Sequence, residues 1–93
     1  MGVRGAVQLV NTSGRGELCL AGEVTAEVVA AFHARYGREP HVVDAVDAGS
    51  VTSLSPAALD LLLDHLDAAE RRGRVVPVRR SPAVARLLSA RRT

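Results

Sequence analysis

The sequence has very few aromatic side chains: Phe32 and Tyr36 are the only two, and tryptophan is absent. Single-stranded nucleic acids are held by bases stacking on exposed aromatic rings, so this scarcity argues against a stacking platform. Lysine is also absent, and all 12 basic residues are arginine. Hydrophobic residues nevertheless make up 47% of the 93-residue chain, which excludes a disordered protein. One small domain with a core of Val, Leu and Ala is the expectation.

Cysteine occurs once, at Cys19, so no internal disulfide can form, which is consistent with a reducing compartment. No stretch contains the roughly 20 consecutive apolar residues of a membrane span, and residues 1–10 lack the apolar region of a secretory signal. We therefore expect a cytoplasmic protein without membrane insertion.

Groups that could perform catalysis or hold a ligand do not converge in the sequence. The three histidines, His33, His41 and His65, do not form a metal-ligand array with Cys19, and phosphate-binding glycine motifs are absent. We expect His33 and His65 at the surface or boundary of helices. Asp44 and Asp47 are expected near the end of a strand, and we interpret them as residues that help to form the turn after it. These patterns predict no enzymatic activity, no metal and no cofactor.

The best-specified element is a helix that begins after Ser55 and ends before Gly73. Ser55 can cap the helix with its hydroxyl, and Pro56 suits the first helical position because its missing N–H is not needed there. Gly73 permits a left-handed stop. A buried stripe is predicted from spacings of three and four residues, and it consists of Leu59, Leu62, Leu63, Leu66 and Ala69.

The remaining elements give the order ββαβαβα. Two short alternating segments separated by a Gly-rich turn predict an antiparallel hairpin, and the later strands flank the long helix as a parallel βαβ unit. We therefore predict a small α/β domain with a mixed sheet of about four strands and three helices. The predicted strands are Ala6–Val10, Glu17–Ala21, His41–Val46 and Arg74–Val78, and the flanking helices start after Thr25 and Ser81.

The net charge of +2 conceals an asymmetry. No arginine lies between Glu39 and Glu70, whereas residues 71–93 contain arginine and no acidic residue. The simplest interpretation is a solvated acidic face and a solvated basic tail. Two docking surfaces of opposite charge, or a basic patch for nucleic acid or an anionic surface, remain alternatives.

Residues 46–63, VDAGSVTSLSPAALDLLL, resemble the central motif of STAS domains, the family of bacterial anti-sigma factor antagonists. Asp47 falls on the family's strand-end Asp. Three further segments are similar: AGEVT at 21–25 to the family's GELD segment, GRVVPV at 73–78 to its late strand, and SPAVARLL at 81–88 to its last helix. The resemblance covers most of the chain and implies the same element order.

The family's phosphorylation motif is altered in this chain. In the family, a partner kinase that is itself the anti-sigma factor phosphorylates a Ser in the DSSG segment, and the added charge switches affinity. Here the four positions read SPAA, with Pro56 in place of the acceptor and Ser55 in place of the preceding Asp. Thr25 likewise replaces the acid of the GELD segment. A displaced acceptor at Ser55 is one interpretation, and helix capping is the favoured one.

The resemblance implies a non-enzymatic module that binds an anti-sigma factor or related kinase-like regulator. The alternative is an accessory subunit of a bacterial lipid-transport ABC complex that binds the transporter ATPase. A lower alternative, binding of nucleic acid or an anionic surface through the Arg-rich C-terminal region, is not favoured, and self-association is left open. The predicted partner-binding residues are Ser50, Ser53, Ser55, Pro56, Asp60 and Asp64.

Overall fold

An antiparallel hairpin forms one side of the central sheet. The computed structural model describes residues 5–91, in which β1 (Gly5–Thr12) pairs with β2 (Arg15–Val24). Ser13 and Gly14 between them have positive φ angles of 53° and 79°, the conformation of a tight hairpin turn whose twist matches that of the strands. The predicted hairpin is confirmed, and both strands are longer than expected.

Two parallel strands complete the sheet. β3 (Ala45–Leu54) lies beside β2, and β4 (Val78–Arg80) lies beside β3, so β1 and β4 are the edge strands. The crossovers between parallel strands are α1 (Ala26–Tyr36) and α2 (Pro56–Arg71). The predicted βαβ unit, the mixed four-stranded sheet and the order ββαβαβα of a small α/β domain are confirmed.

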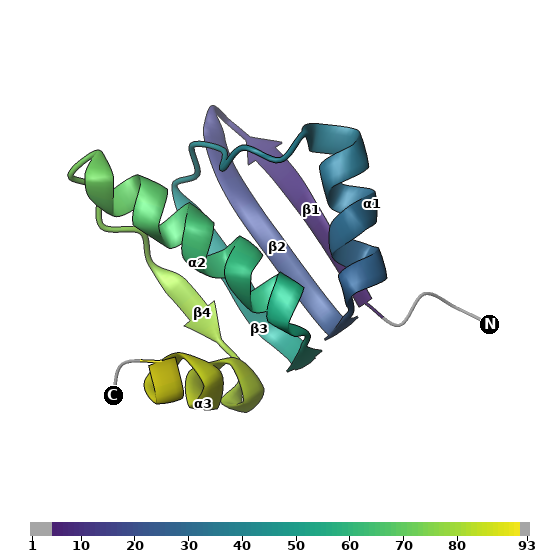
Figure 1. Ribbon diagram of the computed structural model, residues 1–93. Helices are drawn as coiled ribbons and strands as arrows, with labels where there is room; N and C mark the ends of the chain where they lie inside the picture. The colour runs from purple at the N-terminus through teal and green to yellow at the C-terminus, as the bar shows by residue number, and fades with distance from the viewer. Residues whose placement is uncertain (1–4, 92–93) are drawn as a thin grey trace.

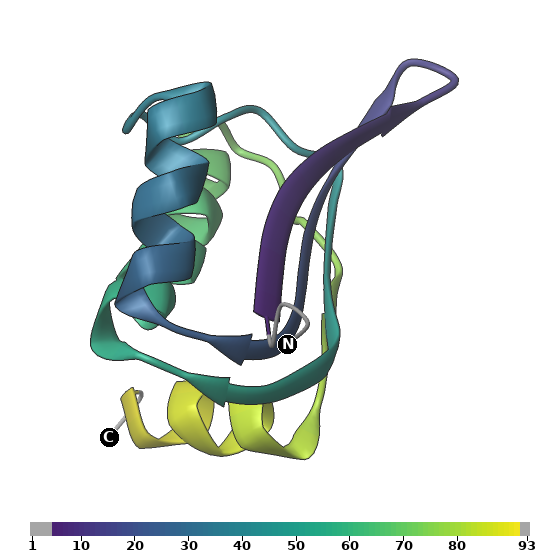
Figure 2. The same cartoon turned by 90° about the vertical axis from the view of Figure 1, so that its right-hand side faces the viewer.

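The helices are distributed unequally around the sheet. α1 and α2 lie over one face (Figure 1), whereas α3 (Pro82–Arg91) lies across the end of the sheet below β3 in Figure 2. No helix within residues 5–91 covers the opposite face. Over the same residues, none of the helices has the length and apolar character that crossing a membrane requires.

The core is built largely from aliphatic side chains, as predicted. Leu18, Val24 and Val46 from the strands and Leu62 and Val84 from the helices are each at most 1% exposed. Full burial of each such side chain stabilises the fold by about 1.5–3 kcal/mol before conformational entropy is counted. α2 and α3 therefore share one core with the sheet.

The position of β3 differs from the prediction. Residues 41–44 lie outside the strand, and β3 instead runs through residues 47–54, which include the expected turn. Pairing with β2 explains the difference, because the ladder continues across two register shifts that accommodate extra residues of β3. The predicted position of the last strand, Arg74–Val78, is also wrong. Pro77 has no N–H to donate to the ladder, and β4 begins only at Val78.

The buried side of α2 is rotated from the predicted leucine stripe. Leu62 and Ala69 are buried as expected, whereas Leu59, Leu63 and Leu66 are only partly buried. The remaining buried positions are Ala58, Leu61 and His65. The surface or boundary position predicted for His65 is wrong, since its side chain is 1% exposed.

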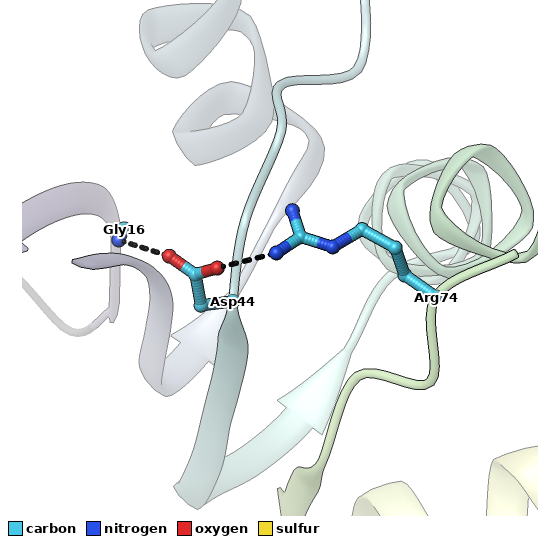
Figure 3. Close-up of polar contacts among 3 residues, drawn as sticks. All are labelled: Gly16, Asp44 and Arg74. Atoms are coloured by element: carbon cyan, nitrogen blue, oxygen red, sulfur yellow. Dashed lines mark hydrogen bonds and ion pairs between the residues drawn. The ribbon is translucent and has the colours of Figure 1, made fainter. Parts of the chain in front are cut away.

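Asp44, just before β3, forms hydrogen bonds to Gly16 in β2 and to Arg74 after α2. Its carboxylate accepts a hydrogen bond from the backbone N–H of Gly16 at 2.8 Å and one from Nη2 of Arg74 at 3.0 Å (Figure 3). The Asp44 N–H in turn donates to the Gly16 carbonyl at 2.7 Å. The expected place of Asp44 and Asp47 near the strand's carboxyl end is therefore wrong, because they lie at its beginning.

Candidate functional site

The start of α2 is held by a side-chain cap. Ser55 has extended backbone angles, and its Oγ accepts a hydrogen bond from the N–H of Ala58 at 3.1 Å. Pro56 occupies the first helical turn, where no N–H is needed. The Ser55 N–H donates to the carbonyl of Val24 at 2.9 Å, which fixes the cap to the end of β2. The capping predicted from the sequence is confirmed.

The starts of α1 and α2 lie at the same end of the sheet (Figure 1). Val24 is paired with Leu54 where β2 and β3 end, and each strand passes directly into the cap of the following helix. Thr25 caps α1, since its Oγ1 accepts from the N–H of Val28 at 3.2 Å. The two segments that resemble the STAS motifs, around Thr25 and Ser55, are thus neighbours in the fold.

An acidic row follows the cap along α2. Pro56, Asp60 and Asp64 are spaced by four residues, which places them on one side of a helix, and all three are exposed. Within residues 5–91, neither aspartate forms an ion pair. Their charges are therefore available to a partner without breaking an internal contact.

A groove flanks this row on each side. The groove toward α1 has a volume of about 500 Å³ and is lined by alanines 26, 30 and 34 together with Asp60 and Asp64. The groove toward α3 has a volume of about 450 Å³ and contains Asp67 and Glu70 besides the same two aspartates. Asp60 and Asp64 thus form a ridge between two depressions, a shape that a protein partner can cover from either side.

Sequence reasoning missed the alanine-lined groove. Its signal was present, because Ala26, Ala30 and Ala34 recur at four-residue spacing on α1. Small side chains on one helix leave space beside the next helix. Only the packing of α1 beside α2 shows that this space adjoins the acidic row.

The two upstream serines are less closely connected to the row. Ser50 is exposed within β3 and pairs with Ala21 beside the first register shift. Ser53 is exposed near the end of β3, opposite Glu23. The chain passes from Ser53, near the end of β3, through the cap at Ser55 directly into the α2 row of Pro56, Asp60 and Asp64. Ser50, in contrast, lies in the middle of β3.

Ser55 is a half-buried residue whose hydroxyl oxygen already accepts the capping hydrogen bond. Pro56, at the family's acceptor position, is exposed but has no hydroxyl. Ser53 is exposed, and no hydrogen bond of its side chain is present within the described residues. The geometry at Ser55 is that of a structural cap.

No group of three or more His, Cys, Asp or Glu side chains in residues 5–91 is arranged to hold a metal ion. Cys19 is half-buried on β2, and its Sγ lies 3.6 Å from Oε1 of Glu17. Burial and the Glu17 carboxylate both raise the pKa of the Cys19 thiol. The thiolate, which is the nucleophilic form of cysteine, is therefore disfavoured.

The mixed sheet and the helices that follow its strands define the class of small α/β domains. The family model described as "Mlab, STAS domain" matches residues 7–92. The chain belongs to the STAS domain family, as its sequence resemblance predicted. No curated protein matches the chain.

Proposed function

We propose that this protein is a non-enzymatic docking module of the anti-sigma factor antagonist type, active in the cytoplasm, whose binding does not depend on phosphorylation at the usual serine. Its partner is an anti-sigma factor or a related kinase-like regulator. The docking face is the start and acidic row of α2, from Ser53 to Asp64. The capped helix start with Pro56 at the acceptor position is the observation that carries this proposal.

The chemistry of the face supports protein binding. Pro56, Asp60 and Asp64 present one apolar ring and two carboxylates on a rigid helix, and a groove on either side can receive partner side chains. Carboxylates arranged in this way favour a partner surface that contains arginine or lysine. Because Pro56 has no hydroxyl, phosphorylation at this position cannot change the affinity of this face.

The accessory subunit of a lipid-transport ABC complex is the second candidate. The matching family model is described as "Mlab, STAS domain", and a subunit that holds a transporter ATPase needs no phospho-acceptor serine. This candidate uses the same fold and the same face of α2. The two candidates differ in the partner, a kinase-like regulator or a transporter ATPase.

The test is capture of partners on the tagged protein at low and moderate salt, followed by titration of each purified partner. A kinase-like regulator that binds wild-type protein and is not displaced by ATP supports the antagonist proposal. A transporter ATPase as the specific partner supports the second candidate. Retention of nucleic acid at moderate salt as the main interaction would contradict both, because counterion release makes nonspecific binding steeply salt-dependent.

A further inference from the structure

The edge strand β1 lacks the features by which proteins normally protect a sheet edge. Such edges are usually short, charged, interrupted by proline or distorted by a bulge. β1 is eight residues long, reads GAVQLVNT without a charge or a proline, and pairs with β2 without a register shift. Its free side presents backbone groups that can pair with another strand.

The other edge of the sheet shows the usual protection. β4 has three residues, two of which are the exposed arginines Arg79 and Arg80, and it directly follows Pro77. The lack of edge protection is therefore specific to β1. It requires an explanation that does not apply to the whole sheet.

α1 lies beside β1, and both elements face the viewer in Figure 2. The helix therefore adds a second possible contact region next to the strand edge. A groove of about 340 Å³ runs between them, lined by Gly5–Gln8 on the strand and by Ala31 and Arg35 on the helix. Glu27, Ala31 and Arg35 follow one another at four-residue spacing and are exposed. No ion pair of Glu27 or Arg35 is present among the described residues.

This row is complementary to itself. When two copies of α1 lie antiparallel around an axis through Ala31, Glu27 of each copy faces Arg35 of the other, and the small Ala31 side chains allow close approach. Antiparallel pairing of two β1 strands around an axis near Gln8 brings Ala6 opposite Val10 and creates no pair of like charges. Val10, 38% exposed in the single chain, is then covered by its neighbour.

We infer that the β1 edge and the Glu27–Ala31–Arg35 row of α1 form a two-fold interface with a second copy of this chain. The two four-stranded sheets join into one continuous eight-stranded sheet, with α1 packed against its symmetry mate. The α2 row lies on another part of the molecule, so each copy keeps its docking face free (Figure 1). A homodimer of this kind presents two docking faces to its partners.

The test measures mass by sedimentation and light scattering across a range of protein concentration. Wild-type protein is expected to form a dimer that dissociates on dilution. Gln8→Lys opposes two like charges across the strand pair and is expected to give a folded monomer with the melting temperature that wild-type protein shows when diluted to the monomer. Ala21→Lys is the matched control, because it adds the same charge on the exposed side of β2, one strand inward, and leaves the dimer intact.

A charge exchange tests the helix contact separately. Glu27→Arg and Arg35→Glu are each expected to weaken the dimer about tenfold, and the double variant is expected to restore it, because the two pairs re-form with opposite polarity. Wild-type protein that stays monomeric throughout, or a dimer that tolerates Gln8→Lys, would overturn the inference. If a monomeric wild type loses a protein partner on Gln8→Lys, the edge accepts a foreign strand instead of a second copy.

Discussion

The imidazole of His65 stacks on that of His41, with ring centroids 5.9 Å apart and an interplanar angle of 24°. His65 Nδ1 lies 2.9 Å from the Leu61 carbonyl, and because a carbonyl oxygen can only accept, Nδ1 carries the proton and donates to that oxygen. The Nε2 atoms of both histidines are buried without a hydrogen-bond partner in residues 5–91. The pair links α2 to the segment before β3.

His65 should make the protein sensitive to mild acid. Burial lowers the pKa of His65, and the positive charge of nearby His41 and His33 acts in the same direction, while the Leu61 hydrogen bond and Asp64 oppose it. Because the unfolded chain takes up the proton more readily than the folded chain, the free energy of unfolding should fall as pH drops below about 6.5. Thermal melts between neutral pH and pH about 5 measure this slope.

His65→Leu removes the titrating group and should flatten the acid slope. The matched control is His33→Gln, which removes a half-buried histidine on α1 and should leave most of the slope in place. An equal slope in wild type and His65→Leu would assign the acid sensitivity to other groups.

Asp44 should stabilise the fold at neutral pH through its two contacts. The hydrogen bond from Gly16 and the charge of Arg74 lower the pKa of Asp44 below its ordinary value. The stabilisation is therefore present above the unfolded pKa of about 3.9 and is lost as pH falls through the lower folded pKa. Asp44→Asn should lower the melting temperature at pH 7, and the difference from wild type should shrink in strong acid. Asp67→Asn, at an exposed position of α2, is expected to have little effect.

Ser55→Ala should destabilise the protein by about 1 kcal/mol, because the Ala58 N–H loses its capping acceptor. Ser55→Asp, which supplies another capping oxygen, should retain most of the stability. Chemical denaturation measures both, with Ser53→Ala as an exposed control expected to change the stability by less than about 0.5 kcal/mol. A loss in Ser53→Ala as large as that in Ser55→Ala would show that the effect is not capping.

The ends of α2 were predictable because they depend on local chemistry: a hydroxyl cap, a proline at the first turn and a glycine after the end. The position of β3 was not, since DAGSVTSL has the composition of a turn and becomes a strand only when β2 supplies a ladder with two register shifts. The burial of His65 could not be predicted from the sequence for a related reason. The leucines form a broad stripe, and the packing of α1 and the segment around His41 determines which part of it is buried.

The candidate site was predictable in part. Pro56, Asp60 and Asp64 share one side of the helix because helical spacing alone requires it. The alanine-lined groove depends on how α1 and α2 pack, and the place of Ser50 depends on the bulged pairing of β3. Tertiary contacts of this kind are not encoded in local periodicity.

Restoring the family's acceptor tests whether the SPAA sequence is what prevents phosphorylation. With a verified partner kinase and ATP, wild-type protein is expected to gain no phosphate, measured by intact mass. Ser55→Asp combined with Pro56→Ser recreates the first two positions of the family motif and is expected to gain one. A phosphate on wild-type protein that disappears in Ser55→Ala would instead show that Ser55 is a displaced acceptor.

Reversing the charge of the acidic row is the direct test of the docking face. Asp60→Arg combined with Asp64→Arg should reduce partner affinity at least about a hundredfold, because two attractive carboxylates become repulsive cations at the centre of the contact. The melting temperature should stay near that of wild type, since both side chains are exposed and form no ion pair within the described residues. Glu39→Arg reverses one carboxylate near the opposite end of α2, beside Arg71 and Arg72, which is half the charge change of the double variant, and should leave the affinity unchanged. If the double variant binds as tightly as wild type, the partner docks elsewhere; if Glu39→Arg weakens binding equally, overall charge rather than this face determines affinity.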